Sequence, residues 1–273
     1  MSSPCILGIV NITEDSFSDG GRYLDPAAAI AHARALAAAG ADVIDLGAAA
    51  SNIDAKPVSA AEEIGRLEPV IAALAEDGTQ LSVDSCLPEV QRFAIAHGTA
   101  FLNDIRGFPD ALFYSELAAA SSRLVVMHAV QDKGRAQPVA LSADEVWDRV
   151  QGFFGKRLPA LERGGIARER LILDPGMGLF LSTRPEASLR VLAGLDRLKR
   201  EFGLPGLVSV SRKSFLRAVT GRPAASEAGP ATLAAELYAA AAGADFIRTH
   251  DPAALRDGLK IVSALHATEL NFV

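Results

Sequence analysis

The sequence is poor in cysteine. Only two of its 273 residues are cysteines, Cys5 and Cys86, and they lie far apart without a Cys-x-x-Cys spacing. A disulfide framework or a structural zinc site needs several suitably spaced cysteines. The composition therefore argues against both and fits a reducing compartment, so we expect a cytoplasmic protein.

Long apolar runs and an excess of positive charge are missing as well. No stretch approaches the roughly 18 apolar residues of a membrane span, and the apolar run from Cys5 to Val10 is too short for a signal peptide. The formal net charge is -6, so the chain has no overall basic field that would attract nucleic acid. We expect neither a membrane nor a nucleic-acid partner, and any anionic ligand has to be held by local cations.

Several common nucleotide and hydrolase motifs are also absent. The sequence contains no Walker A, HExxH or GxSxG motif, and no predicted strand is followed by GxGxxG. The missing glycine motif disfavours a Rossmann domain.

Short apolar runs that alternate with alanine-rich helical segments are what the sequence does contain. The stretch from Pro26 to Gly40 is typical, because proline favours the first turn of a helix and glycine its end. The predicted strands cover residues 6–11, 42–47, 81–85, 101–105, 124–128, 171–174, 207–211 and 246–249.

These eight strand–helix units follow one another without a linker or a change in composition. Buried strands that are separated by helices pair in parallel, with right-handed crossovers. The length of 273 residues is close to the roughly 250 residues of a (β/α)8 barrel. We therefore predict an α/β fold in which residues 1–273 form one TIM-barrel domain, in preference to an open doubly wound sheet.

Each predicted strand ends in polar or sulfur-containing residues. In a TIM barrel the catalytic groups lie at the carboxyl ends of the strands. These ends carry Asn11, Asp45, Asp84, Asn103-Asp104, Met127-His128, Asp174, Arg212-Lys213 and Arg248 with His250. A set of carboxylates, amides and cations suits a flat heterocycle with an amidine-like edge, such as a guanine or a pterin.

Some of these residues have alternative interpretations. For Asp45 and Asp104, a structural role in helix capping or in a structural hydrogen bond is as compatible with the sequence as contact with a ligand. The role of His128 remains undecided. Arg248 and His250 follow the last strand, where TIM barrels often bind phosphate, so we expect them to contact an anion.

Several motifs resemble those of the dihydropteroate synthases. The segment IVNITEDSFSDGG at residues 9–21 resembles the first signature of that family. Further matches follow in the family's order at residues 82–85, 103–105, 127–128, 174–178, 211–214 and 248–251. The resemblance spans essentially the whole chain. It implies an enzyme of folate biosynthesis that joins 7,8-dihydropterin-6-ylmethyl diphosphate to 4-aminobenzoate, forming 7,8-dihydropteroate and releasing pyrophosphate. Because alanine-rich helices can pack across a dimer interface, we also expect a homodimer.

The resemblance also implies roles for individual residues. By this resemblance Asp84, Asn103, Asp174 and Lys213 would hold the pterin, and Asp84, Asp174 and Lys213 would be catalytic. Asn11 with Mg²⁺, Arg248 and His250 would hold the diphosphate, and Phe17, Ser51 and Ser211 would shape the aminobenzoate site. From their own chemistry, we expect Met127 to press against the face of the pterin ring and Phe180 to border the aminobenzoate site. In the family the C–O bond breaks largely before the amine attacks. Mg²⁺ and the cations would then stabilise the leaving pyrophosphate, while the carboxylates offset positive charge on the ring.

Two loops depart from the usual family pattern. Ser51 can stand for the threonine of the Gly-Gly-x-Ser-Thr-Arg-Pro loop, but Asn52 replaces its arginine, and the segment LFLS at residues 179–182 replaces Phe-Gly-Lys. Both features resemble the plasmid-borne, sulfonamide-resistant synthases. We predict low sulfonamide sensitivity, because Phe180 would clash with the drug's extra substituent. We also hypothesise that Lys56 or Arg22 supplies the charge missing at Asn52.

Two other functions remain open at this point. A methyltransferase that passes a methyl group from methyltetrahydrofolate to a corrinoid protein shares the barrel and the pterin carboxylates, but it does not need the contacts to a diphosphate. A non-catalytic pterin-binding protein is the other alternative, which the change at Asn52 keeps open. The sequence does not decide between a housekeeping and an acquired resistance enzyme.

Overall fold

The computed structural model describes residues 3–13, 24–50, 56–131 and 138–269. Its eight strands form one parallel sheet in the order β6-β5-β4-β3-β2-β1-β8-β7. The strands are β1 Cys5–Asn11, β2 Val43–Gly47, β3 Leu81–Asp84, β4 Phe101–Asp104, β5 Arg123–Met127, β6 Leu171–Asp174, β7 Leu207–Val208 and β8 Phe246–Thr249.

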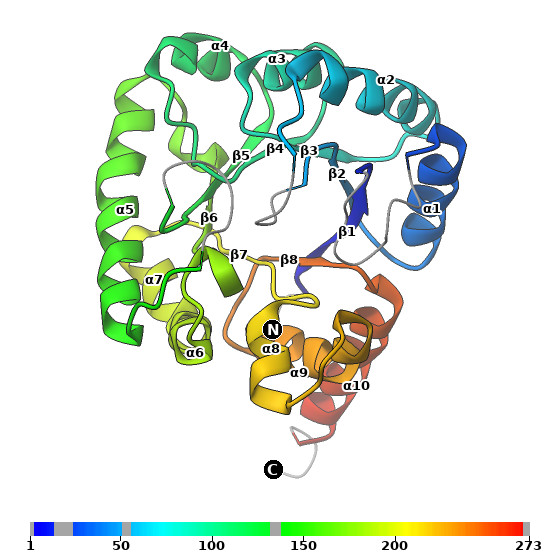
Figure 1. Cartoon of the computed structure of the whole chain (residues 1–273). Helices are drawn as coiled ribbons and strands as arrows, with labels where there is room; N and C mark the ends of the chain where they lie inside the picture. Colours follow the sequence, from blue (N-terminus) through cyan, green and yellow to red (C-terminus); the bar gives the residue numbers. More distant parts are fainter. Residues whose placement is uncertain (1–2, 14–23, 51–55, 132–137, 270–273) are drawn as a thin grey trace.

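Contact between the two outer strands of this order closes the barrel. Leu173 of β6 forms a parallel bridge with Gly206, directly before β7, and its N–H donates to the carbonyl oxygen of Pro205 at 2.9 Å. The helices surround the strands on the outside (Figure 1). The predicted TIM barrel is therefore confirmed.

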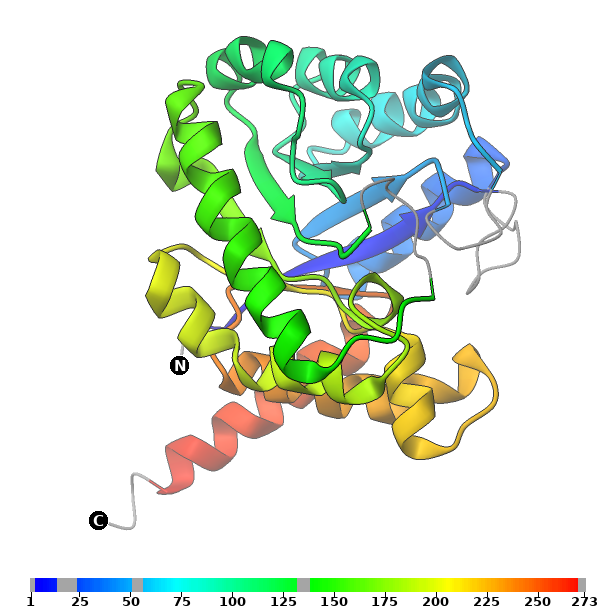
Figure 2. The same ribbon diagram turned by 60° about the vertical axis from the view of Figure 1, so that its left-hand side comes forward.

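The helices follow the strands as the sequence predicts. They are α1 Pro26–Ala38, α2 Ala60–Glu76, α3 Pro88–Ala96, α4 Tyr114–Ala119, α5 Ala143–Arg163, α6 Pro185–Ala193, α7 Leu195–Phe202, α8 Ser214–Thr220, α9 Gly229–Ala241 and α10 Pro252–Glu269. Short 3-10 turns lie at Ala111–Phe113, Arg168–Arg170, Gly178–Phe180 and Ala225–Ala228. The long α5 packs beside α6 on the outside of the barrel (Figure 2). None of the helices in the described ranges is long and apolar enough to cross a membrane.

Local sequence signals explain where several helices begin. Ser142 accepts a hydrogen bond from the backbone N–H of Glu145, whose side chain accepts one from the Ser142 N–H in return. This capping box satisfies backbone donors at the start of α5, as the sequence predicted. Pro26 occupies the first turn of α1, where its missing N–H is not needed.

Two elements differ from the sequence prediction. The predicted helix over residues 185–202 is interrupted at Gly194, between α6 and α7. The Trp147 ring packs so closely here that a Cβ atom would lie 2.2 Å from it, so the position is restricted to glycine. The predicted strand over residues 207–211 keeps strand pairing only at Leu207–Val208. It ends early because the Lys213 N–H donates to the carbonyl of Val210, and Arg212 adopts a left-handed conformation with φ of 58° in this turn.

Apolar side chains fill two regions. Strand residues such as Val10 and Leu102 point outward and form the main core with the helices. A smaller cluster of strand residues packs together apart from it: Leu7, Val43, Phe101, Val125, Ile172, Leu207 and Phe246. Because strand side chains alternate, residues two and four places further along these strands point to the same side as this inner cluster. The inner cluster therefore fills the lower barrel and leaves its carboxyl end to polar groups.

Candidate active site

One row of inward-facing residues forms the upper layer of the barrel. The strand register places Asn11 beside Gly47, Gly47 beside Asp84, and Asp84 beside Asn103. A Cβ atom on Gly47 would lie 3.7 Å from the Asn11 Oδ1 atom and 3.8 Å from the Asp84 Cβ atom. Asn11 and Asp84 therefore flank the glycine on the same side of the sheet.

The other half of this layer comes from the later strands. Met127 pairs with Asp174 across β5 and β6. The Oδ1 atom of Asn103 is buried and has no hydrogen-bond partner among the described residues. A buried acceptor of this kind is available to a ligand that carries a donor group.

Asp104, in contrast, has a structural role. Its carboxylate accepts from the N–H groups of Arg106 and Phe108 at 2.7 and 3.1 Å, and from the Gln91 Nε2 atom at 3.1 Å. It follows Asn103 directly in β4, so strand alternation turns it to the opposite side of the sheet. The sequence left open whether Asp104 contacts a ligand or has a structural role. Its hydrogen bonds show that the structural role is correct.

Arg248 joins two strands in the middle of the site. Its Nε atom lies 2.5 Å from Oδ2 of Asp45, and its Nη2 atom lies 2.9 Å from Oδ2 of Asp84. Burial alone would lower the pKa of Arg248, but the carboxylates of Asp45 and Asp84 raise it above its ordinary value. The guanidinium thus remains charged at the barrel mouth.

Burial also changes the proton affinities of the neighbouring groups. It raises the pKa of Asp84 to about 7, although Arg248 opposes the change. It raises the pKa of Asp174 to about 6, while the backbone N–H of Gly176, which donates to Asp174 Oδ1 at 2.8 Å, opposes the change. Burial and the nearby Arg248 lower the pKa of Lys213 to about 8. Titratable groups whose pKa values converge near neutrality are typical of functional sites.

An apolar wall borders these charges. Ile105, Met127 and Phe180 form a buried cluster. The Lys213 ammonium nitrogen lies 4.9 Å from the centre of the Phe180 ring, a cation–π contact. Phe180 is held by its backbone, since its carbonyl oxygen accepts from the Val130 N–H at 2.9 Å. The site therefore combines a flat apolar surface with a charged edge.

Ser211 and His250 lie together at the ends of the last two strand segments. The Ser211 hydroxyl oxygen is 2.9 Å from His250 Nδ1, and it accepts from the His250 backbone N–H at 3.2 Å. Burial, together with the nearby cations Arg212 and Arg248, holds the pKa of His250 well below its ordinary value. A neutral imidazole at this position can donate one hydrogen bond and accept another.

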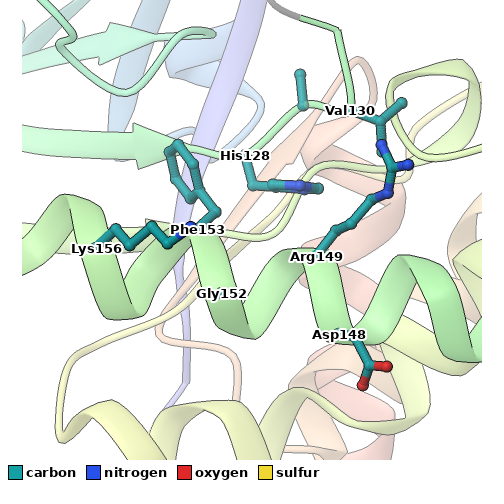
Figure 3. A pocket seen from close by; sticks show the side chains of 8 residues that line it. His128, Val130, Asp148, Arg149, Gly152, Phe153 and Lys156 are labelled. Carbon is teal, nitrogen blue, oxygen red and sulfur yellow. The ribbon is translucent and has the colours of Figure 1, made fainter.

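His128, which the sequence left undecided, supports the loop beneath Asp174. Its backbone N–H donates to the Asp174 carbonyl at 2.8 Å, and its Nδ1 atom is 3.1 Å from the Pro175 carbonyl oxygen. Burial lowers the pKa of His128 to about 4, so the neutral ring donates to Pro175. The ring borders a groove of about 430 Å³ along α5 that Arg149 and Phe153 also line (Figure 3).

Comparison with known proteins places the chain in a family. The family described as "Pterin binding enzyme" matches residues 7–250. A "Dihydropteroate synthase type-2" of Escherichia coli is 60% identical over 263 residues, which cover 96% of each chain. The chain belongs to the dihydropteroate synthases. The enzyme class predicted from the motifs is thereby confirmed.

Solved dihydropteroate synthases share the fold. The Xanthomonas albilineans enzyme with 4-aminobenzoic acid is 38% identical, with a TM-score of 0.87 over 97% of this chain and 94% of that chain. The same enzyme in complex with 7,8-dihydropteroate is 33% identical, with a TM-score of 0.82 over 97% of this chain and 94% of that chain.

Most of the residues predicted for this synthase site are brought together. Asp84, Asn103, Met127, Asp174 and Lys213 lie at the carboxyl end of the barrel with Asn11, Arg248, His250, Phe180 and Ser211. Phe17 and Ser51, predicted for the aminobenzoate site, lie outside the described residues, as do Asn52 and Arg22.

Sequence reasoning undervalued one residue of the synthase site. Asp45 is fully buried on β2 and pairs with Arg248. The sequence alone gives equal weight to a structural role and to a role in the site for this residue. The signal was its position two residues before Gly47, because alternation turns both toward the barrel interior.

Proposed function

We propose that this synthase condenses 7,8-dihydropterin-6-ylmethyl diphosphate with 4-aminobenzoate, releases pyrophosphate, and does so with reduced sensitivity to sulfonamides. The observation that carries the proposal is the arrangement around Arg248, which joins Asp84 to a barrel mouth that also holds Asp174 and Lys213. Relatives that have been solved with 4-aminobenzoic acid and with 7,8-dihydropteroate support the choice of substrates.

The pterin ring would bind among the carboxylates. Asp84 and Asp174 accept from ring N–H and amino groups, and Lys213 donates to a ring carbonyl. Asn103 offers its unpartnered amide oxygen to a further donor. Met127, in the buried apolar cluster, would press against the ring face.

The diphosphate would bind at the other end of the mouth. Arg248 keeps N–H groups beyond the two that bond Asp45 and Asp84, and a guanidinium fork fits phosphate oxygens. His250 lies beside Ser211 on the neighbouring strand end and would complete the anion contacts.

Asn11 is the residue that would hold Mg²⁺. Its amide oxygen faces the row that contains Asp84, and oxygen donors suit this cation. The described part of the chain contains no cluster of three or more His, Cys, Asp or Glu side chains fit to hold a metal by itself. This donor set fits Mg²⁺ because that ion is commonly held by one or two protein oxygens together with substrate phosphates. When bound, Mg²⁺ would supply charge that stabilises the leaving pyrophosphate.

The protein's own residues would divide the charge of the reaction between two ends of the site. Breaking the C–O bond leaves negative charge on pyrophosphate, which Arg248 stabilises, and positive charge on the pterin, which Asp84 and Asp174 stabilise. The amine of 4-aminobenzoate then attacks the methylene carbon and loses a proton. No covalent enzyme intermediate is needed.

Phe180 would set the sensitivity to sulfonamides. Its ring is only 7% exposed and is held against Met127 and Lys213 at the edge of the mouth. A sulfonamide carries a substituent beyond the part that mimics 4-aminobenzoate, so a fixed ring can exclude the drug and admit the substrate. Ser211, together with Phe17 and Ser51 outside the described residues, stays a prediction for the aminobenzoate site.

Lys56 remains a candidate for the missing loop charge. With Arg66 and Thr13 it lines a small cavity of about 110 Å³ near the end of β1. Lys56→Ala, compared with the exposed Lys260→Ala on α10, is expected to raise the KM for the pterin diphosphate. If Lys56→Ala and Arg22→Ala both leave turnover and pyrophosphate binding intact, neither residue supplies the charge.

A coupled assay of pyrophosphate release, run with both substrates and with sulfamethoxazole, tests the proposal. Release that requires 4-aminobenzoate supports the synthase activity, whereas a methyltransferase or a non-catalytic pterin-binding protein would release none. Phe180→Leu is expected to lower the drug's Ki while the matched Phe202→Leu on α7 leaves it unchanged. A wild-type Ki as low as that of an ordinary synthase would contradict the reduced sensitivity. The homodimer, which sedimentation velocity can test, and the cytoplasmic location stay predictions.

A further inference from the structure

We infer that Asp45 is a positioning residue of this enzyme: it anchors Arg248 so that Asp84 can be released to the pterin and the free end of Arg248 can meet the diphosphate. The inference rests on the proposed roles of Asp84 and Arg248. It goes further by giving a role to a residue that touches neither substrate.

The position of Asp45 places it below the groups that are proposed to bind the pterin. It pairs with Ser82 in the strand register, one layer below the row of Gly47 and Asp84. Its side chain is 0% exposed, whereas that of Asp84 is 30% exposed. Arg248 lies between the two carboxylates, so by contact Asp45 acts on the substrate-binding groups through the guanidinium. Its charge also raises the pKa values of Asp84 and Asp174.

The hydrogen-bond pattern gives the anchor a direction. Asp45 binds Nε, which is the guanidinium nitrogen nearest to the Arg248 backbone, and Asp84 binds the terminal Nη2. Holding Nε from below points the two terminal nitrogens toward the mouth. A planar guanidinium held at one edge is oriented for a two-pronged contact with phosphate oxygens.

Charge balance explains why a second carboxylate is needed. The Arg248 side chain is only 13% exposed, so its charge requires a partner at all times. If Asp84 were the sole partner, binding of a pterin to Asp84 would compete with the ion pair. With Asp45 in place, Arg248 keeps one carboxylate when Asp84 turns to the ring and the diphosphate takes the terminal nitrogens.

The experiment compares Asp45→Asn with Ser82→Ala, a substitution in the same buried layer at a side chain with no hydrogen-bond partner in the described structure. Asp45→Asn is expected to raise the KM for the pterin diphosphate at least about tenfold. In Asp45→Asn, the KM for 4-aminobenzoate should stay near the wild-type value. The urea midpoint of the control Ser82→Ala should also stay near the wild-type value. Asp45→Glu keeps the charge and is expected to recover part of the loss.

A double substitution separates positioning from a general effect on the fold. Because Asp45 acts through Arg248, Asp45→Asn combined with Arg248→Met should be no worse than Arg248→Met alone. The inference would be overturned if the losses of the two single variants multiply in the double variant. It would also be overturned if Asp45→Asn has the same KM for the pterin diphosphate as Ser82→Ala. If Arg248→Met alone leaves the KM for the pterin diphosphate unchanged, the proposed site fails instead, and the two failures are thus distinguishable.

Discussion

Replacing Asp174 by asparagine is expected to stabilise the fold, and more so as the pH rises. The carboxyl is 2% exposed, and burial raises its pKa from the ordinary 3.8 to about 6. A group with a raised folded-state pKa stabilises the fold below its unfolded pKa, and this contribution is lost as the pH rises through the folded pKa. Asparagine does not titrate, and its amide oxygen can still accept from the Gly176 N–H.

The two pKa values give the size of the effect. The difference between 3.8 and about 6, at 1.36 kcal/mol per pKa unit, corresponds to about 3 kcal/mol of stability lost by pH 8. Roughly half of this is already lost at pH 5, because the unfolded chain is ionised there. The stability advantage of Asp174→Asn should therefore grow by roughly 1 kcal/mol between pH 5 and pH 8.

Urea unfolding at several pH values in this range measures the effect. The control is Asp148→Asn, an exposed carboxylate on α5, whose free-energy difference from wild type should stay constant within about 0.5 kcal/mol. Asp174→Asn should also lose synthase activity, since the stabilised form lacks the charge that the reaction uses. A free-energy difference that stays flat with pH would refute the argument. One that falls with rising pH would show that Lys213 more than offsets the cost of burying the carboxylate.

Two further predictions concern catalysis and packing. The kcat/KM should rise as Asp84 ionises near pH 7, because the carboxylate form accepts hydrogen bonds from the ring donors. It should fall as Lys213 loses its proton near pH 8. A pH–rate profile that is flat across both values would contradict the assignment of these two groups. Gly194→Ala should destabilise the fold by about 1–3 kcal/mol, because its Cβ would lie 2.2 Å from the Trp147 ring. Gly152→Ala in the middle of α5 meets nothing within 4 Å and should instead stabilise by up to about 1 kcal/mol, as thermal unfolding of both variants can measure.

The fold was predictable because its signals are local and repeated. Each buried strand and each alanine-rich helix can be read from a short window, and parallel pairing follows from their alternation. The requirement for glycine at the break between α6 and α7 was not predictable, because it depends on the close approach of Trp147, more than forty residues earlier in the chain. The early end of β7 likewise depends on a turn at Arg212 that the apolar run of residues 207–210 does not reveal.

The site was predictable to the extent that strand ends converge. Asp84, Asp174 and Lys213 could be grouped because the barrel brings successive strand ends to one mouth. Partners within that group were not predictable, since Arg248 and Asp45 are 203 residues apart and their pairing depends on three-dimensional geometry. Period-two alternation would have separated Asn103 from Asp104, because neighbouring strand residues face opposite sides.

The division of the barrel interior into layers explains how the fold tolerates a charged site. The lower layer consists of apolar residues such as Leu7 and Ile172, which pack away from water and stabilise the closed sheet. Above it, Arg248 lies between Asp45 and Asp84, so these three charged groups are paired within hydrogen-bond distance. The barrel therefore confines the cost of burying charge to one end, where binding of an equally polar substrate can offset it. A chain that replaced this upper layer by apolar residues would gain stability and lose the groups that separate charge during the reaction.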